Sequence, residues 1–123
     1  GMIPGSGGSI RLLHMIGMSR TKDLVMRSRW ISGKESESWG IALKCVKDNM
    51  LEEATNALVS ELLTFSPLAQ RTIKKVLYTA QDTSLHAGIE LEGQEYGRLR
   101  TSNDFAAGVK AFNEKKKAKW SGT

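Results

Sequence analysis

The sequence has few of the residues that cross-link or interrupt a chain. Its one cysteine, Cys45, cannot form an internal disulfide, which favours a reducing, cytoplasmic location. Two prolines in 123 residues are compatible with a helix-rich core. No apolar run approaches the ~20 residues of a membrane span, and the glycine-rich N-terminal region lacks the apolar core of a secretory signal. We therefore expect a cytoplasmic domain with no membrane partner.

Local motifs for metal binding or acid–base catalysis are also missing. His14 and His86 stand far apart with no cysteine or aspartate cluster around either, so no metal site is predicted. No ordered set of Ser, His and Asp and no Cys and His pair has local support. Glu35 and Glu37 stand two residues apart in a predicted short helix, where their side chains point in different directions. We expect both glutamates to be exposed rather than to act as paired acids.

Positive charge is concentrated near the C-terminal end of the sequence, within a formal net charge of +5. Such a segment favours an anionic partner. The candidates are a phosphate-bearing cofactor, a nucleic acid and a membrane surface. It is equally typical of a solvated helix end, where lysines complement the helix dipole. No helix-turn-helix glycine or aromatic stacking platform supports a nucleic-acid partner. The lysines concerned are Lys110, Lys115, Lys116, Lys117 and Lys119.

The spacing of apolar residues predicts a mainly helical fold with one short strand. Apolar residues recur at steps of three and four in most segments and alternate, weakly, only in "IALKCV", residues 41–46. We expect Ser66, followed by proline at the first helical position, Ser84 and Ser102 to be helix N-caps. Gly17 is expected to end the first helix. The expected helices cover about 10–16, 19–29, 34–39, 51–65, 67–81, 85–100 and a last segment from 103 into the terminal lysines.

Two sets of glycines are informative. Gly88, Gly93 and Gly97 weaken the helix expected over 85–100 by roughly 1 kcal/mol each relative to alanine, so we expect close packing against that face. The turn over residues 5–8 precedes a helix N-terminus, whose free backbone N–H groups can bind an anion or a ligand oxygen. It has neither the Lys-Ser/Thr of a P-loop nor the spacing of a dinucleotide-binding motif. A tight turn that lets the helix approach another backbone is the alternative.

Four stretches resemble the latter half of the enoyl-CoA hydratase/isomerase (crotonase) superfamily. "IPGSGGSIRLL" is similar to its Pro-Gly-x-Gly-Gly-Ser/Thr-x-x-Leu segment, and "MIGMSRTKDLVMRSRWISGKESESWGIALKCV" is similar to the following helix, turn and short strand. "SPLAQRTIKKVL" is similar to a family helix that begins with Ser or Gly and Pro. "EYGRLRTSNDFAAGVKAFNEKKKAKWSG" is similar to the C-terminal signature. Together the stretches cover nearly the whole chain in the family's order and spacing.

The resemblance implies the C-terminal helical part of a crotonase-like fold without its N-terminal β-β-α spiral core. In the family that core holds the oxyanion-hole N–H groups for the thioester carbonyl and, in hydratases, the two glutamates that handle the water. We therefore expect a truncated protein, related to acyl-CoA (fatty acid) metabolism, that does not hydrate a substrate alone. Ser9-Ile10 stands where many hydratases have Thr-Gln, and Ser36 and Ser38 stand where alanines are usual, which leaves the reaction subtype open.

The resemblance also implies roles for four residues. Gly5 matches the glycine whose backbone lies by the reacting atoms, and Tyr96 matches an aromatic position near the acyl chain. Phe112 and Lys115 match residues that contact the adenine and phosphate end of coenzyme A, often across a subunit boundary. An aromatic face suits a purine, and an ammonium suits a phosphate. Ordinary packing is the alternative for Tyr96 and Phe112, and a solvated helix end is the alternative for Lys115.

The expected organisation has three parts. Gly1-Met2 has the form of a tag scar and start, residues 3–50 carry the glycine turn, helices and short strand from the end of the crotonase core, and residues 51–123 form a C-terminal oligomerisation and CoA-tail region. We expect no tightly bound cofactor and no metal, with coenzyme A entering as part of a thioester substrate. The many amphipathic faces imply burial against other subunits, in trimer-type contacts or with a full-length relative. A non-catalytic oligomerisation or binding module is the alternative to an acyl-CoA enzyme fragment.

Overall fold

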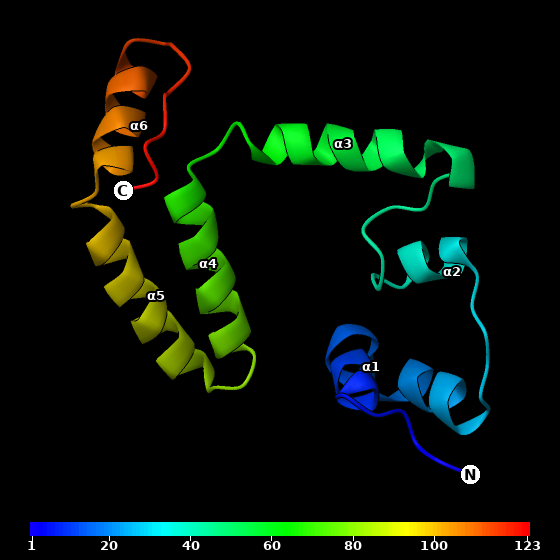
Figure 1. The fold of residues 1–123 in the computed structure, drawn as a ribbon. Coiled ribbons are helices and arrows are strands. Elements are labelled where there is room, and N and C mark those ends of the chain that lie inside the picture. The colour runs from blue at the N-terminus through cyan, green and yellow to red at the C-terminus, as the bar shows by residue number, and fades with distance from the viewer. The chain divides into compact units, whose positions relative to one another are not determined.

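The computed structural model describes residues 1–123 as a set of helices joined by short loops (Figure 1). The mainly helical class predicted from the sequence is confirmed. The chain divides into two compact units, residues 1–54 and 55–123. No helix is both long enough and apolar enough to cross a membrane. The elements are α1 (Gly8–Met26), α2 (Gly33–Ser38), the 3-10 turn η1 (Asp48–Met50), α3 (Leu51–Leu62), α4 (Pro67–Ala80), α5 (Leu85–Leu99) and α6 (Asn103–Asn113).

In the first unit, α1 is broken at Gly17. The φ of 77° and ψ of 170° at Gly17 are not helical, and a positive φ is one that glycine adopts without strain. The Thr21 hydroxyl donates to the Gly17 carbonyl at 2.8 Å and so satisfies an oxygen beside the break. The predicted end of a helix at Gly17 is therefore confirmed, and the segment expected over 19–29 is the second half of α1.

The short helix α2 is held by a reciprocal cap and by Arg29. The Ser32 hydroxyl accepts from the Glu35 N–H at 3.2 Å, and the Glu35 carboxylate accepts from the Ser32 N–H at 3.1 Å. Arg29 donates to Asp23 at 2.9 Å and to Glu35 at 2.5 Å, which joins the end of α1 to α2. The Ser32 N–H and then the Arg29 guanidinium lower the pKa of Glu35 below its ordinary value. Glu35, expected to be exposed, is thus half-buried and part of the structure.

The strand predicted over residues 41–46 is wrong. Gly40, with a φ of 77°, ends α2 in the left-handed region. The N–H groups of Ile41 and Ala42 both donate to the Ser36 carbonyl, at 2.9 and 3.1 Å, so the helix cap uses the first amides of the segment. The structure contains no strand with which the remaining backbone amides of this segment could pair. The weakly alternating apolar residues therefore lie in an irregular loop, in which Leu43 is exposed.

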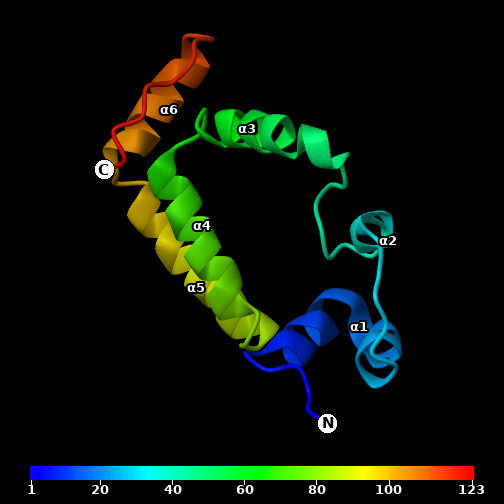
Figure 2. The same cartoon turned by 45° about the vertical axis from the view of Figure 1, so that its right-hand side comes forward.

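In the second unit, α4 and α5 form an antiparallel hairpin (Figures 1 and 2). The predicted N-caps of both helices are confirmed. The Ser66 hydroxyl accepts from the Ala69 N–H at 3.0 Å, and the Ser84 hydroxyl accepts from the Ala87 N–H at 3.3 Å. Across the hairpin, Lys75 donates to the Glu95 carboxylate at 2.9 Å.

The glycines of α5 differ in their surroundings. A Cβ at Gly88 would lie 3.3 Å from the Cβ of Ala80, so the missing side chain lets α5 approach α4. Gly93 and Gly97 have no neighbour within 4 Å of the corresponding position. The close packing expected on the glycine face of this helix is therefore confirmed at Gly88 only.

The C-terminal segment, residues 114–123, turns back and runs along α6 to its first turn (Figures 1 and 2). Ser102 caps α6 as predicted, since its hydroxyl accepts from the Phe105 N–H at 3.0 Å. The Asp104 N–H, which is one of the free amides at the start of α6, donates to the Thr123 carbonyl at 3.1 Å. The end of the chain thus lies against the beginning of its last helix.

Both units leave much apolar surface uncovered. Leu24 in the first unit and Val76 and Ala111 in the second are the only buried apolar residues. The helix α3 has no buried residue and exposes leucines such as Leu58 and Leu62. Apolar faces of this extent are unusual for a domain that works alone.

Candidate functional site

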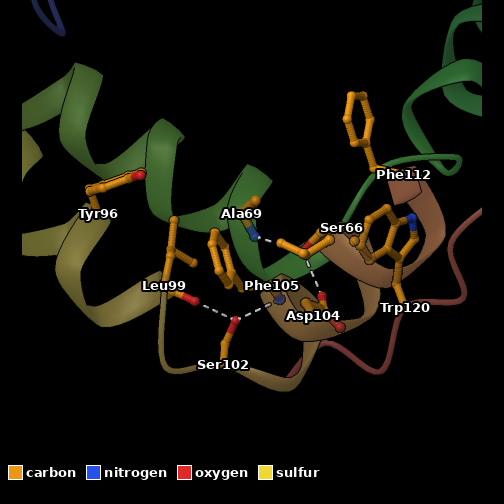
Figure 3. A pocket seen from close by; sticks show the side chains of 11 residues that line it. Ser66, Ala69, Tyr96, Leu99, Ser102, Asp104, Phe105, Phe112 and Trp120 are labelled. Carbon is orange, nitrogen blue, oxygen red and sulfur yellow. Dashed lines mark hydrogen bonds between the residues drawn. The ribbon is translucent and has the colours of Figure 1, made fainter. Parts of the chain in front are cut away.

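The second unit contains an apolar cavity of about 400 Å³ between α4, α5, α6 and the C-terminal segment (Figure 3). This volume lies within the range of small-molecule binding sites. In Figure 3 Tyr96 lies on one side of the cavity and Phe112 and Trp120 lie on the other, with Leu99 and Phe105 between them. Three polar side chains also line the cavity, and each of them has hydrogen-bond partners.

Asp104 is the most buried of these polar residues, with 3% of its surface exposed. Its Oδ2 accepts from the Ser66 hydroxyl at 2.5 Å. Its Oδ1 accepts from the Ser121 N–H at 2.7 Å, the Ser121 hydroxyl at 3.1 Å and the Gly122 N–H at 3.0 Å. The Ser66 hydroxyl and then the backbone N–H groups lower the pKa of Asp104, against the opposing effect of burial. An ionised carboxylate with one donor on Oδ2 and three on Oδ1 thus joins α6, α4 and the C-terminal segment.

The two serines that line the cavity are the caps of α4 and α6. Ser66 accepts from the Ala69 N–H and donates to Asp104. The Ser102 hydroxyl accepts from the Phe105 N–H and donates to the Leu99 carbonyl at 2.7 Å. Each hydroxyl therefore uses its proton and an acceptor site within the protein, as Figure 3 shows.

Trp120 is fixed at one end of the cavity. Its indole N–H donates to the Thr64 carbonyl at 2.7 Å. A Cβ at Gly108 would lie 3.3 Å from two atoms of the indole ring, so the ring packs directly on the backbone of α6. Arg71 of α4 donates to the Gly122 carbonyl at 3.1 Å. These contacts and those of Asp104 hold the C-terminal segment in place.

Two of the predicted site residues, Tyr96 and Phe112, line this same cavity. Their exposed fractions are 58% and 84%, so both aromatic rings remain open to a ligand. The guanidinium carbon of Arg100 lies 6.0 Å from the centre of the Tyr96 ring. The structure therefore brings together two aromatic residues that are 16 positions apart in the sequence.

Lys115 lies in the turn that ends α6. Its N–H donates to the Phe112 carbonyl at 3.1 Å, and the Lys116 N–H donates to the Ala111 carbonyl at 2.9 Å, which is the pattern of a Schellman motif. The φ of Lys115 is 55°, in the left-handed region where glycine is usual. Lys116 pairs with Glu114 at 3.0 Å, whereas the Lys115 ammonium has no acidic partner. Its charge is therefore available to an anion.

Gly5 lies in the first unit, in the turn before α1. The Gly8 N–H donates to the Gly5 carbonyl at 3.0 Å, and Ser6 and Gly7 have positive φ values of 55° and 78°. The predicted glycine turn before a helix is thus present. There is open space within 4 Å of the position that a Cβ at Gly5 would occupy.

Asp104 and Trp120 were not predicted as site residues. Asp104 lies in the first turn of α6, where a carboxylate complements the helix dipole, so its presence has a local explanation. That local explanation misses its partner Ser66, which is 38 residues away. The partner of Trp120, Thr64, is 56 residues away. The sequence offered a signal in each case, an acid beside a helix cap and an aromatic residue near the terminus, but no means of pairing them.

The side chains of the cavity are suited to binding rather than to acid–base catalysis. Its one carboxylate is buried, accepts four hydrogen bonds and has a lowered pKa, and neither His14 nor His86 lines the cavity. No three His, Cys, Asp or Glu side chains in the chain are grouped so that they could hold a metal ion. An apolar space with aromatic walls fits the apolar part of a ligand, and the unpaired ammonium of Lys115, which does not line the cavity, is available to an anionic part.

The chain belongs to the enoyl-CoA hydratase/isomerase family, whose model matches residues 1–123. The resemblance found in the sequence motifs is therefore confirmed.

Two curated relatives show how much of the family's length is present. The chain is 31% identical over 121 residues to "Probable enoyl-CoA hydratase 2, mitochondrial" of Arabidopsis thaliana, covering 98% of this chain and 40% of that protein. It is 30% identical over 125 residues to "Methylglutaconyl-CoA hydratase, mitochondrial" of Homo sapiens, covering 98% of this chain and 37% of that one.

Solved structures give the same result for the fold. The chain matches the crystal structure of an enoyl-CoA hydratase from Bacillus anthracis with a TM-score of 0.94 and 31% identity, over 99% of this chain and 47% of that one. The chain thus spans less than half the length of these relatives, and its helices are those of the C-terminal part of the crotonase fold.

Proposed function

We propose that these 123 residues are the acyl-CoA-binding C-terminal part of a family member that acts in acyl-CoA (fatty acid) metabolism, and that they do not hydrate enoyl-CoA alone. The observation that carries the proposal is the cavity, because it combines apolar walls with two exposed aromatic rings. Coenzyme A would enter as part of a thioester substrate and not as a tightly bound cofactor. The free thiol of Cys45 suits a reducing compartment such as the cytoplasm.

Three residues of the second unit receive proposed roles. Tyr96 would lie against the acyl chain, and Phe112, with 84% of its surface exposed, would stack on the adenine. Lys115 would bind a phosphate, since its ammonium has no acidic partner and the residue lies two positions beyond the end of the helix that carries Phe112.

For Gly5, in the first unit, we propose close approach of its backbone to the reacting group. The open space around it supports this role. The stabilisation of a thioester oxyanion would need further N–H donors, and hydration would need carboxylates that can exchange protons. Asp104 has a lowered pKa, and its oxygens hold α4, α6 and the C-terminal segment together. This structural use of the one carboxylate in the cavity wall supports the proposal that the chain is not catalytic by itself.

Calorimetric titration and a hydration assay test the two halves of this proposal. Coenzyme A should bind saturably, and Lys115→Gly should weaken binding more than Lys116→Ala, because the Lys116 ammonium is already paired with Glu114. The chain alone should not consume the conjugated thioester of crotonyl-CoA above background. Absence of binding would contradict the assigned site, and measurable turnover would contradict the non-catalytic role.

A second candidate function, a non-catalytic oligomerisation module, is favoured by the exposed apolar surface. The chain exposes 10065 Å², whereas two separate globules of half its mass would together expose about 7,900 Å². The excess is larger than the roughly 800 Å² that one partner buries in a standard interface. The unburied helix α3 is suited to contact with further copies or with a full-length relative. Light scattering tests this candidate, which predicts an oligomer and is contradicted by a monomer.

A further inference from the structure

We infer that the cavity accepts an acyl group whose inserted end is an uncharged hydrocarbon, and that it discriminates against an acyl group ending in a carboxylate. The inference rests on the proposed function, because it concerns the acyl part of an acyl-CoA bound there. It is carried by the hydrogen bonds of the polar side chains in the cavity wall.

Nearly all polar side-chain groups in the wall already have partners. The hydroxyls of Ser66 and Ser102 each donate one hydrogen bond and accept another. The carboxylate of Asp104 accepts four hydrogen bonds, and the indole N–H of Trp120 donates to a backbone carbonyl. Only the Tyr96 hydroxyl has no hydrogen-bond partner. A ligand in the cavity therefore meets one free hydroxyl among otherwise apolar surface.

A carboxylate brought into this space would lose its water without gaining a counterion. No lysine, arginine or histidine side chain lines the cavity. The guanidinium of Arg100 lies over the Tyr96 ring, 6.0 Å from its centre, but is not part of the wall. The one charged group that is part of it, Asp104, has the same sign as the incoming carboxylate. Burial of an unpaired charge is strongly unfavourable, whereas burial of a hydrocarbon against such walls is favourable.

A matched pair of thioesters tests the inference by calorimetric titration of the full chain. Hexanoyl-CoA and adipoyl-CoA have acyl chains of equal carbon number, and only the second ends in a carboxylate. Hexanoyl-CoA should bind about 10-fold more tightly than coenzyme A itself, and adipoyl-CoA should bind no more tightly than coenzyme A. Equal affinity for the two thioesters would overturn the inference. Failure of all three compounds to bind would instead overturn the proposed function.

A substitution that changes polarity but not shape provides a second test. Val109→Thr places a hydroxyl in the cavity wall, and Val59→Thr in α3 makes the same change outside it, at nearly equal exposed fractions of 46% and 45%. Val109→Thr should weaken binding of hexanoyl-CoA by about 3-fold to 10-fold, with coenzyme A unaffected, and Val59→Thr should change neither. Circular dichroism would establish that both variants fold. Equal hexanoyl-CoA affinities for the two folded variants would contradict the inference.

Discussion

Replacing Lys115 by glycine should stabilise the second unit while removing a proposed phosphate contact. The φ of Lys115 is 55°, and an L-residue in the left-handed region costs about 1–2 kcal/mol that glycine does not. Glycine also lowers the free energy of unfolding by about 0.5–1 kcal/mol, because it gives the unfolded chain more conformational freedom. The free energy of unfolding should therefore rise by roughly 0.5–1 kcal/mol, which for a unit of this size corresponds to a rise in Tm of about 2–8 °C.

Thermal unfolding followed by circular dichroism measures this change, with Lys115→Ala as the matched control. Alanine removes the same ammonium but keeps a Cβ in the left-handed conformation, so its Tm should not rise. The difference between the two variants isolates the backbone effect. A glycine variant that melts at or below the alanine variant would refute the reasoning. Both variants should lose affinity for coenzyme A, and should lose less for 3′-dephospho-CoA if that phosphate is the one bound.

Three further predictions concern the cavity wall. Ser66→Ala should lower the free energy of unfolding by more than the ~1 kcal/mol typical of a lost N-cap, because Asp104 also loses a donor. Ser84→Ala is the control, since it removes a cap alone. Equal losses for the two variants in urea denaturation would contradict the role of the Asp104 contact. Gly108→Ala should leave the free energy of unfolding nearly unchanged, because a gain of about 1 kcal/mol in helix propensity is offset by crowding against the indole ring at 3.3 Å. Gly93→Ala, in open space, should keep the full gain. Equal gains in the two variants would contradict close packing of Trp120 on α6. The pKa of Asp104 is lowered from its ordinary 3.8, so the stability that its ionised form contributes is complete above that value and is lost as the pH falls through the lower folded-state pKa. Asp104→Asn should therefore weaken the dependence of the free energy of unfolding on pH between about 5 and 2. An unchanged pH dependence in this range would contradict the prediction.

The sequence allowed the helices to be predicted where the signals are local. Ser66 followed by Pro67 marks the start of α4 because a serine oxygen and a proline nitrogen both suit the first turn. Gly17 and Gly40 mark breaks because their positive φ values are accessible to glycine. Each of these signals concerns atoms a few residues apart, so no tertiary contact was needed to interpret it.

Predictions failed or were missing where the outcome depends on distant atoms or on an unusual residue. The segment over 41–46 has strand-like alternation, but no second strand is present and the cap of α2 takes its first amides. Lys115 occupies a position where glycine is expected, so the turn that ends α6 has no sequence signal. The wall of the cavity depends on Asp104 and Trp120, whose partners lie 38 and 56 residues away.

The indole N–H resonances of the chain provide the most direct test that the cavity of the second unit binds an acyl-CoA. The three tryptophans are Trp30 and Trp39 in the first unit and Trp120, which alone lines the cavity. Titration with hexanoyl-CoA, followed by nuclear magnetic resonance of the ¹⁵N-labelled chain, should shift the Trp120 signal saturably and leave the other two in place. A stationary Trp120 signal at saturating ligand, or equal shifts of all three, would contradict the account.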